Sequence, residues 1–117
     1  MKIYLAAQFK EQVLMREWRR LLHNAGHIVT SRWLDEKTET LQARNAAGID
    51  IADIEISDIV ISKTLNRGDL FTGGGRHWEA GYAFAKGKKL INVGGIESVF
   101  HSFATRYDTI EECIKCL

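Results

Sequence analysis

Glu79 is the residue whose type and surroundings point most directly to chemistry. It follows a run of three glycines that ends in Gly74 and Gly75, and its other neighbours are apolar or small. Glycines before a helix let the backbone approach a ligand closely and leave N–H groups free to bind it. We expect Glu79 in the first turn of that helix, where the helix dipole stabilises a carboxylate. Position alone favours a structural role for this acid over a role as nucleophile. The groups around Glu79 therefore decide between the two roles.

A second group of acids lies upstream of Glu79. Asp50 and Asp53 are three residues apart and would share one face of a helix, whereas Asp58 opens a strand. They lie among isoleucines, so we expect at least one of them to face a cleft. Two carboxylates that meet at one sugar are what glycosyl transfer with retention uses: one attacks the anomeric carbon and the other handles the leaving group's proton. Solvated or capping acids remain the alternative for Asp53 and Asp58, and spacing alone does not select Asp50.

Two aromatic residues are further candidates for this site. Tyr4 lies in an apolar run, where a buried hydroxyl needs a partner, and core packing accounts for it equally well. Trp33 would either stack on a base at the end of a strand or cap the core. The histidines lack the spacing of metal ligands, so we expect no metal and no cofactor. They are His23, His27, His77 and His101.

The elements that must hold these residues alternate between strands and helices. Apolar runs predict strands over residues 2–7, 27–33, 58–62 and 89–93, with a short fifth strand over 105–107. Helical patterns cover 11–25, 41–56 and 76–86, and a last helix starts at Thr109. This order predicts a parallel sheet with helices on both faces, in which ligands bind at the carboxyl ends of the strands.

Composition sets the class of protein. The 117 residues are 45% hydrophobic and 26% charged, which predicts one globular domain over 1–117 and excludes disordered and fibrous proteins. A net charge of +1 gives no reason to expect nucleic acid or a membrane as partner. The first apolar run is too short for a signal peptide, so we expect a cytoplasmic protein. Cys113 and Cys116 lie at the end of a predicted helix, which favours packing or surface thiols over a redox pair.

Together these motifs resemble the nucleoside 2-deoxyribosyltransferase family, in particular its short members in phages and bacteria. The resemblance covers nearly the whole chain, in five motifs that occur in the family's order. The matching stretches are residues 2–6, 26–34, 50–54 with 57–58, 74–83 and 97–101. The family implies a flavodoxin-like (Rossmann-like) domain with a five-stranded parallel sheet.

The resemblance also implies roles for single residues. Glu79 would form a covalent glycosyl-enzyme intermediate, Asp50 would lie near the base or sugar, and Tyr4 would position the nucleophile. Ser98 of a neighbouring subunit would reach the 5′ end of the sugar, which requires a homodimer or larger homo-oligomer. The other expected substrate-binding residues are Gly74, Gly75, Arg76, Trp33 and Asp53.

The sequence departs from the family at two places. Six residues before the nucleophile, where the transferases carry an aspartate, this chain has Gly73, and Asp69 is the only acid nearby. The related 2′-deoxynucleoside 5′-phosphate N-hydrolases hold the phosphate with an arginine-bearing loop after the first strand. Here that stretch is 7–10, and Lys10 or Arg76 would have to substitute.

The expected activity is cleavage of the N-glycosidic bond of a 2′-deoxynucleoside, with transfer of the sugar to another base. The partners would be a small-molecule nucleoside or nucleotide and a free base. The alternatives are an N-hydrolase acting on nucleosides or nucleoside monophosphates, and a non-catalytic nucleotide-binding module.

Overall fold

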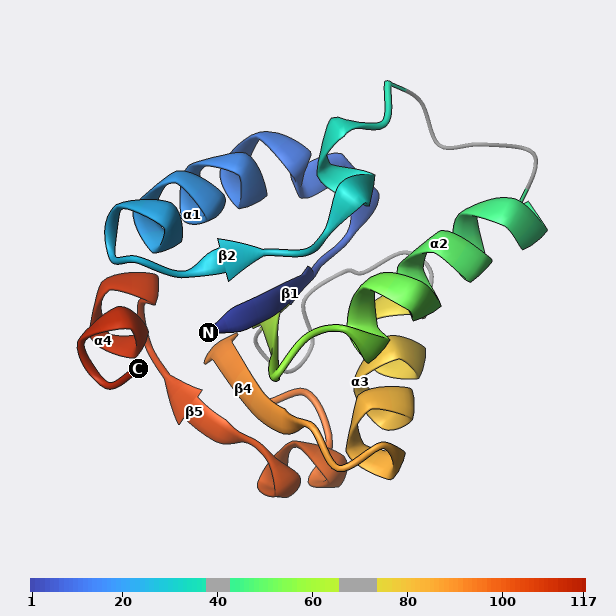
Figure 1. Ribbon diagram of the computed structural model, residues 1–117. Coiled ribbons are helices and arrows are strands. Elements are labelled where there is room, and N and C mark those ends of the chain that lie inside the picture. The colour runs from blue at the N-terminus through green and yellow to red at the C-terminus, as the bar shows by residue number, and fades with distance from the viewer. Residues whose placement is uncertain (38–42, 66–73) are drawn as a thin grey trace.

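A computed structural model describes residues 1–37, 43–65 and 74–117 of the chain (Figure 1). Five parallel strands form one sheet in the order β2-β1-β3-β4-β5. They are β1 (Lys2–Ala6), β2 (Ile28–Val29), β3 (Ile59–Thr64), β4 (Lys89–Gly94) and β5 (Thr105–Tyr107). The flavodoxin-like fold class expected from the sequence is confirmed. The strand order reverses between β1 and β3, which places the switch point of the sheet there.

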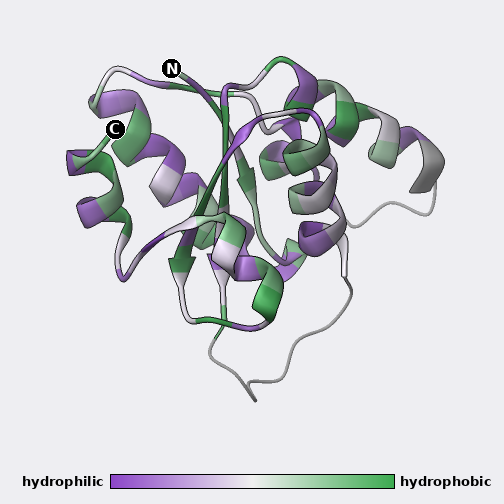
Figure 2. Ribbon diagram, turned by 90° about the horizontal axis from the view of Figure 1, so that it is seen from below, coloured by the Kyte–Doolittle hydropathy of each residue, from purple (hydrophilic) through white to green (hydrophobic). Residues whose placement is uncertain are grey.

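Helices cover both faces of the sheet. They are α1 (Gln12–Asn24), α2 (Ala43–Glu55), α3 (Gly75–Ala85) and α4 (Ile110–Lys115). Figure 2 shows α1 and α4 on one side of the strands and α2 and α3 on the other. In the part of the chain that the structure describes, no helix is long and apolar enough to cross a membrane.

The core lies around the central strands. Residues 3–6 of β1 are fully buried, as are Val60 and Ile61 of β3. Strands covered on both faces read as continuous apolar runs, which is why the sequence pattern identified them. Gly26 follows α1 with φ of 91°, a left-handed conformation that glycine adopts readily. Both cysteines are free, with Cys113 buried and Cys116 exposed, as expected for packing and surface thiols.

The second strand is much shorter than the predicted range 27–33. The chain leaves the sheet after Val29 and forms a 3₁₀ helix, η2 (Arg32–Asp35). Side chains then replace the backbone ladder along β1. The Leu5 N–H donates to Ser31 Oγ at 2.6 Å, and Trp33 Nε1 donates to the Leu5 carbonyl at 2.8 Å. Because these side chains satisfy the backbone N–H and carbonyl groups of Leu5 in β1, the backbone after Val29 can turn away from the sheet.

Candidate active site

Tyr4, Asp50 and Glu79 converge from three different elements, β1, α2 and α3. The charges of Glu79 and Asp50 both act on the Tyr4 hydroxyl, and that of Asp50 acts on Glu79. Each residue carries a buried oxygen with no hydrogen-bond partner among the described residues: Tyr4 Oη, Asp50 Oδ1 and Glu79 Oε2. Unpaired buried oxygens are rare in folded proteins, and here three of them face one place.

Glu79 is held in a state that resists ionisation. Burial raises its pKa from 4.5 to about 8, and the charge of Asp50 adds to the effect. The Tyr4 hydroxyl opposes this shift, although its contact with Glu79 falls short of a regular hydrogen bond. The prediction that Glu79 lies in the first turn of its helix is wrong. Because α3 starts at Gly75, Glu79 is in the second turn, away from the free N–H groups that would stabilise its charge.

Asp50 also has a raised pKa, with causes different from those at Glu79. Burial comes first, followed by the charges of Glu36 and Asp53, and Arg32 partly offsets them. The resulting pKa is about 6, compared with 3.8 for an ordinary aspartate. Asp50 therefore releases its proton about two pH units below Glu79, so the environments separate two chemically similar carboxyl groups.

Tyr4 is fully buried and stays neutral. Burial raises the pKa of its hydroxyl far above 10, and the charges of Glu79 and Asp50 raise it further. A neutral hydroxyl beside two carboxyl groups can donate one hydrogen bond, and a carboxylate is its strongest acceptor here. The arrangement is suited to orienting Glu79 once that group ionises.

The other two acids of the upstream group do not join this cluster. Asp53 is buried and accepts from Arg32 twice, from the backbone N–H at 2.9 Å and from Nε at 2.8 Å. This pair fixes η2 against α2, so Asp53 acts on the site through Arg32 and Asp50. Asp58 accepts from the Lys2 N–H at 2.9 Å, at the opposite end of the strands. Asp50 is the member of the group that lies near Tyr4 and Glu79, and its place in a cleft stays a prediction.

Trp33 belongs to the core. Its side chain is buried, its Nε1 is hydrogen-bonded to Leu5, and its ring lies 6.4 Å from that of Phe9. Of the two interpretations open from the sequence, packing is the one that this environment favours. Gly75, by contrast, lies against the cluster, because a Cβ at that position would lie 3.8 Å from Glu79 Oε1.

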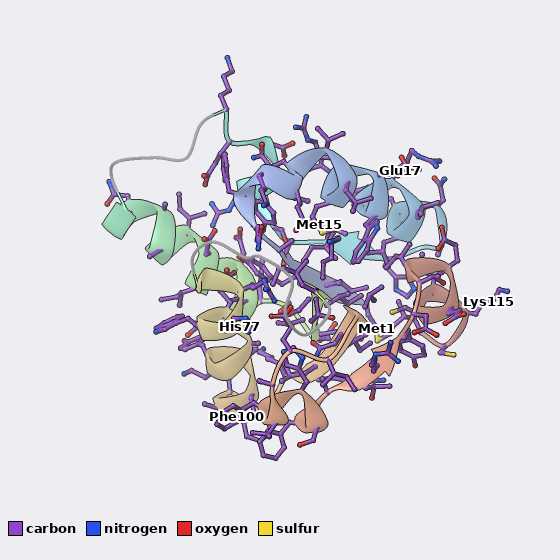
Figure 3. The ribbon with its side chains drawn as sticks, turned by 180° about the vertical axis from the view of Figure 1, so that it is seen from behind. Met1, Met15, Glu17, His77, Phe100 and Lys115 are labelled. Atoms are coloured by element: carbon purple, nitrogen blue, oxygen red, sulfur yellow. The ribbon has the colours of Figure 1, made fainter. Side chains whose placement is uncertain are left out.

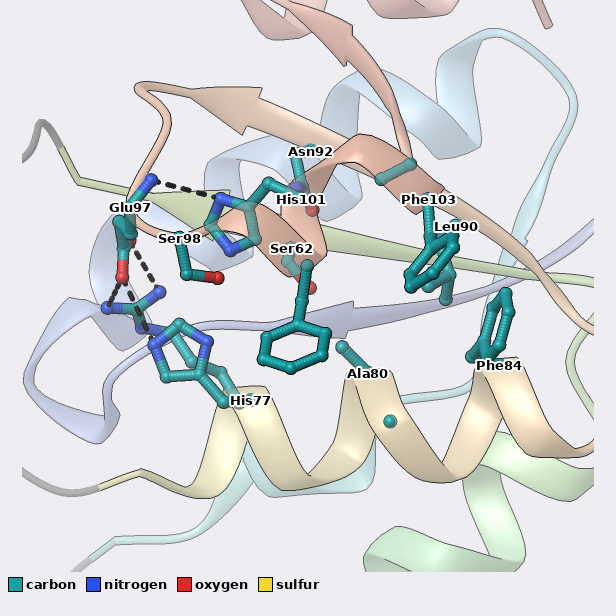
Figure 4. Close-up of a pocket in the computed structure, with 14 residues that line it drawn as sticks. Ser62, His77, Ala80, Phe84, Leu90, Asn92, Glu97, Ser98, His101 and Phe103 are labelled. Carbon is teal, nitrogen blue, oxygen red and sulfur yellow. Dashed lines mark hydrogen bonds and ion pairs between the residues drawn. The ribbon is translucent and has the colours of Figure 1, made fainter.

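Arg76 and Ser98 line a groove of about 510 Å³ beside α3 (Figure 4). The groove runs between α3 and the 3₁₀ helix η3 (Val99–Phe103), which the sequence patterns did not predict. Its lining includes the polar Ser62, Asn92 and Ser98 and the apolar Phe84, Phe100 and Phe103. Figure 3 shows Phe100 at the edge of the molecule beside α3. Tyr4, Asp50 and Glu79 do not line this groove.

A network of charged side chains lies at one end of the groove (Figure 4). Arg76 donates to both oxygens of Glu97, at 2.6 and 2.8 Å, and the Leu65 N–H donates to the same carboxylate. Burial raises the pKa of Glu97, but these hydrogen bonds outweigh it and hold the pKa below its ordinary value. Arg76 thus ties the start of α3 to the segment after β4.

His77, Glu97 and His101 bring one potential metal-ligand atom each within 4.8 Å of one another. Spacing between histidines did not reveal this group, because Glu97 is its third member. The Glu97 oxygens already accept from Arg76, and His101 Nδ1 accepts from the Glu97 N–H at 3.1 Å. A cation would face the Arg76 guanidinium, so the group is better described as an ion-pair network than as a metal centre.

Sequence reasoning missed two further buried polar side chains, Gln8 and Thr64. Within residues 1–37, 43–65 and 74–117, neither of these side chains has a hydrogen-bond partner. Their position after apolar strands was a weak signal, since many buried polar residues bond to nearby backbone. Only the tertiary structure shows that these two do not.

Solved structures resemble this chain closely in fold, although no family model and no curated protein matches its sequence. A 2-deoxyribosyltransferase from Bacillus psychrosaccharolyticus superposes with a TM-score of 0.79, covering 97% of this chain and 90% of its own at 20% identity. The chain has the fold of the 2-deoxyribosyltransferases.

Two other structures support this. A CMP N-glycosidase from Clostridium botulinum has a TM-score of 0.65 and 21% identity, over 99% of this chain and 97% of its own. A 2-deoxyribosyltransferase from Leishmania mexicana has a TM-score of 0.61 and 20% identity, over 83% of this chain and 65% of its own. These are the kinds of protein that the sequence resembles, so the resemblance is confirmed.

The two departures from the family differ in what the structure says about them. Asp69 and Gly73 lie outside the described residues. In the stretch after β1, Lys10 is exposed in the 3₁₀ helix η1 (Phe9–Glu11). Arg76, the other candidate for phosphate binding, is buried and paired with Glu97.

Proposed function

We propose that this protein cleaves the N-glycosidic bond of a 2′-deoxynucleoside and transfers the sugar from Glu79 to another base. The observation that carries the proposal is the meeting of three unpartnered buried oxygens, from Tyr4, Asp50 and Glu79, at the switch point of the sheet. Two of the structures that share the fold are 2-deoxyribosyltransferases, which supports the same chemistry here.

In the first step, a Glu79 carboxylate oxygen attacks C1′ of the sugar. A C1′–O bond forms, and the C1′–N bond breaks with its electron pair passing to the base. Asp50 donates a proton to the departing base, which therefore leaves neutral. Positive charge develops on the sugar in the transition state, and the carboxylate beneath it stabilises that charge before trapping it covalently.

In the second step, a ring nitrogen of an incoming base attacks C1′, and the bond to Glu79 breaks. The proton lost by that nitrogen returns to Asp50, which restores the starting state of both carboxyl groups. Tyr4 holds the Glu79 carboxylate in line with C1′ by donating its hydroxyl proton. Asp53 supports the reaction indirectly, because it holds Arg32 next to Asp50.

Hydrolysis is the second candidate, in which water replaces the incoming base. It is favoured by the match with a CMP N-glycosidase over nearly the whole of both chains. The chemistry up to the covalent intermediate is common to both reactions. They differ only in the group that attacks the intermediate.

Incubation with a deoxynucleoside, with and without a second free base, tests the proposal. A new nucleoside identifies a transferase, and free deoxyribose in its place identifies a hydrolase. Glu79→Gln should lower turnover at least ~10³-fold, because the amide is nearly isosteric but a poor nucleophile. If the parent protein turns over none of a panel of deoxynucleosides and monophosphates, the binding-module alternative replaces the enzyme.

We also propose that a second copy of the chain completes the site. Ser98 lines the groove, whereas Glu79 does not, and Ser98 borders apolar side chains that are largely exposed. Val99, Phe100 and Phe103 are 78%, 71% and 59% exposed. A homodimer that buries this surface would bring Ser98 of each subunit toward the sugar in the other.

A further inference from the structure

Ser62 and Asn92 are buried polar residues that the mechanism above does not use. They are only 5% and 6% exposed, and both line the groove beside α3 (Figure 4). Across residues 1–37, 43–65 and 74–117, neither side chain makes a hydrogen bond to another residue. A buried polar group without a partner is unfavourable, so two of them on one groove point to a ligand that satisfies both.

The sheet places these two side chains next to each other. Ser62 of β3 and Asn92 of β4 are paired residues of adjacent strands, which run about 4.8 Å apart, so both side chains lie on the same face. Leu90 lies two residues before Asn92 on that face and also lines the groove. A hydroxyl and a carboxamide side by side offer a ligand both hydrogen-bond donors and acceptors.

The walls of the groove are suited to a flat ring. Phe84 of α3 stacks on Phe103 of η3, with ring centroids 4.7 Å apart, and both line the groove. The small Ala80 and Gly81 line it from α3. Its volume of about 510 Å³ falls within the roughly 300–1,000 Å³ of small-molecule sites. An aromatic ligand gains stacking energy against such walls.

Charges in the groove favour an uncharged ligand. Arg76 pairs with Glu97 at 2.6 Å, and His77 Nε2 lies 3.1 Å from the same carboxylate. His101 Nδ1 accepts from the Glu97 N–H. Because the positive and negative groups neutralise each other, the groove does not select for an anion or a cation.

A lactam ring meets all of these conditions. Its adjacent N–H and C=O groups match the amide oxygen and NH₂ group of Asn92 in a pair of hydrogen bonds. A further polar atom on the ring can bond to the hydroxyl of Ser62. Nucleobases such as hypoxanthine carry this edge on a flat, uncharged ring.

We propose that the groove beside α3 binds a free nucleobase, whose lactam edge is held by Asn92 and Ser62. The three residues of the catalytic cluster do not line this groove, so the site is separate from the catalytic one. The inference goes beyond the proposed function and does not depend on turnover. A second copy over η3 would cover the exposed edges of Phe100 and Phe103 and leave the sheet floor to the base.

Calorimetric titration with hypoxanthine tests the proposal, with 1-methylhypoxanthine as the matched ligand that lacks the lactam N–H. The parent should bind hypoxanthine at the groove about 10-fold more tightly than the methylated base. Asn92→Leu keeps the side-chain volume but removes the amide, and it should weaken hypoxanthine binding about 10-fold or more. Ser62→Ala is a smaller change and should weaken it about 3-fold. A base bound at the catalytic cluster would give a second binding event that both variants retain.

Proton NMR of the histidine rings places the bound base. His77 and His101 line the groove, so hypoxanthine should shift their ring signals in the parent and no longer shift them in Asn92→Leu. His23, exposed on α1, is the internal control and should not respond.

Two further controls separate recognition from folding. Asn24→Leu makes the same change at the exposed end of α1 and should alter neither the affinity nor the shifts. The midpoint of thermal unfolding of Asn92→Leu should equal or exceed that of the parent, because no hydrogen bond among the described residues is lost. A fall in that midpoint would show that the amide serves the fold.

The outcomes also distinguish this inference from the proposed function. Equal hypoxanthine affinity of the parent and Asn92→Leu, or His77 and His101 signals that do not move at millimolar hypoxanthine, would overturn the groove site and leave the enzyme assignment intact. Amide-dependent binding by a protein that cleaves no nucleoside would support the groove site while the proposed function fails.

Discussion

In the proposed mechanism, the protonation states of Glu79 and Asp50 determine when the site can react. The first step needs Glu79 ionised and Asp50 protonated, but their pKa values of about 8 and about 6 favour the reverse. The productive pairing therefore reaches only about 1% of the molecules near pH 7, where it is at its maximum. Two effects offset this low population. A carboxylate with a raised pKa is a stronger nucleophile, and an acid with a pKa near 6 donates its proton readily.

We expect kcat/KM of the parent to depend on pH in a bell-shaped curve with apparent pKa values near 6 and 8. These two values belong to the coupled pair of Asp50 and Glu79. Asp50→Asn should remove the alkaline limb, because that limb reports loss of the acid once Glu79 is ionised. Activity should then rise with pH through a single pKa somewhat below 8, since the Asp50 charge no longer raises that of Glu79. Rates measured between pH 5 and 9.5 check this.

The size of the Asp50 effect should depend on the base. General acid catalysis contributes roughly 10²–10⁴-fold, and it matters least when the base departs easily. We therefore expect Asp50→Asn to reduce cleavage most for poor leaving bases. Asp58→Asn is the matched control, because Asp58 lies at the far end of the strands and should leave the profile unchanged. A uniform loss across bases would remove Asp50 from the acid role.

Burial of Glu79 should also be visible in stability. Below pH 4.5 the group is protonated in both folded and unfolded chains, and above pH 8 it is ionised in both. Between these values the unfolded chain releases the proton first, so stability falls as pH rises. Glu79→Gln removes this penalty, and its advantage in free energy of unfolding should grow to roughly 2–4 kcal/mol by pH 8.

Denaturant unfolding of the parent and Glu79→Gln at pH 4.5, 6 and 8.5 measures that difference. The exposed Glu111→Gln serves as control and should show no such trend. A Glu79→Gln advantage that stays constant across this range would mean that the carboxyl group is not buried in the folded protein. The same experiment shows that the variant is folded, which the activity test requires.

At this scale the sequence named Glu79, Asp50 and Tyr4, and the structure brings them together. It did so largely through the resemblance, because spacing alone did not single out Asp50. Gln8 and Thr64 were not predictable, since a residue's lack of a partner depends on everything that packs around it. The network around Glu97 was hidden for the same reason, with partners from three separate segments.

Elements were predicted best where burial was most complete. Strands β1, β3 and β4 carry continuous apolar runs, and Thr109 caps α4 as expected by accepting from the Glu112 N–H at 3.2 Å. β2 was predicted too long. After its β-branched residues, the side chains of Ser31 and Trp33, and not their backbone, make the hydrogen bonds to β1. η3 was missed, since a single 3₁₀ turn leaves no periodic pattern in the sequence.

Gly94 lies where the ends of strands β3 and β4 approach each other closely. It ends β4 with φ of 130°, and a Cβ there would lie 2.2 Å from the Thr64 carbonyl oxygen. Gly94→Ala should therefore destabilise the fold by about 2 kcal/mol or more, through strain and through displacement of Thr64. Thermal and urea unfolding measure the loss.

Gly48→Ala is the matched control for that change. Gly48 lies within α2 with open space around a new Cβ, so alanine should stabilise the helix by up to ~1 kcal/mol. If Gly94→Ala is as stable as the parent, the close approach between the ends of β3 and β4 is not a real constraint.

For the whole molecule, the connection between β4 and β5 explains where the groove beside α3 lies. That connection contains only η3, and α4 follows β5 onto the opposite face. The sheet floor at Ser62, Leu90 and Asn92 therefore opens into the groove beside α3. A parallel sheet is ordinarily covered on both faces, and we propose that a layer from outside the chain completes the cover beside α3.

We expect that layer to be a second copy, held by the apolar residues of η3. Phe100→Ser should shift the protein to monomer and lower activity, whereas Val13→Ser, on α1 and equally exposed, should change neither. Sedimentation at assay concentrations measures the oligomer. Mixing equal amounts of Glu79→Gln and Ser98→Ala chains, each of low activity alone, should restore activity, because a hybrid dimer contains one site with both residues. Random exchange makes half of the dimers hybrid, which predicts recovery of about a quarter of the parent's sites. An active monomer, or mixtures no more active than their components, would show that each chain completes its own site.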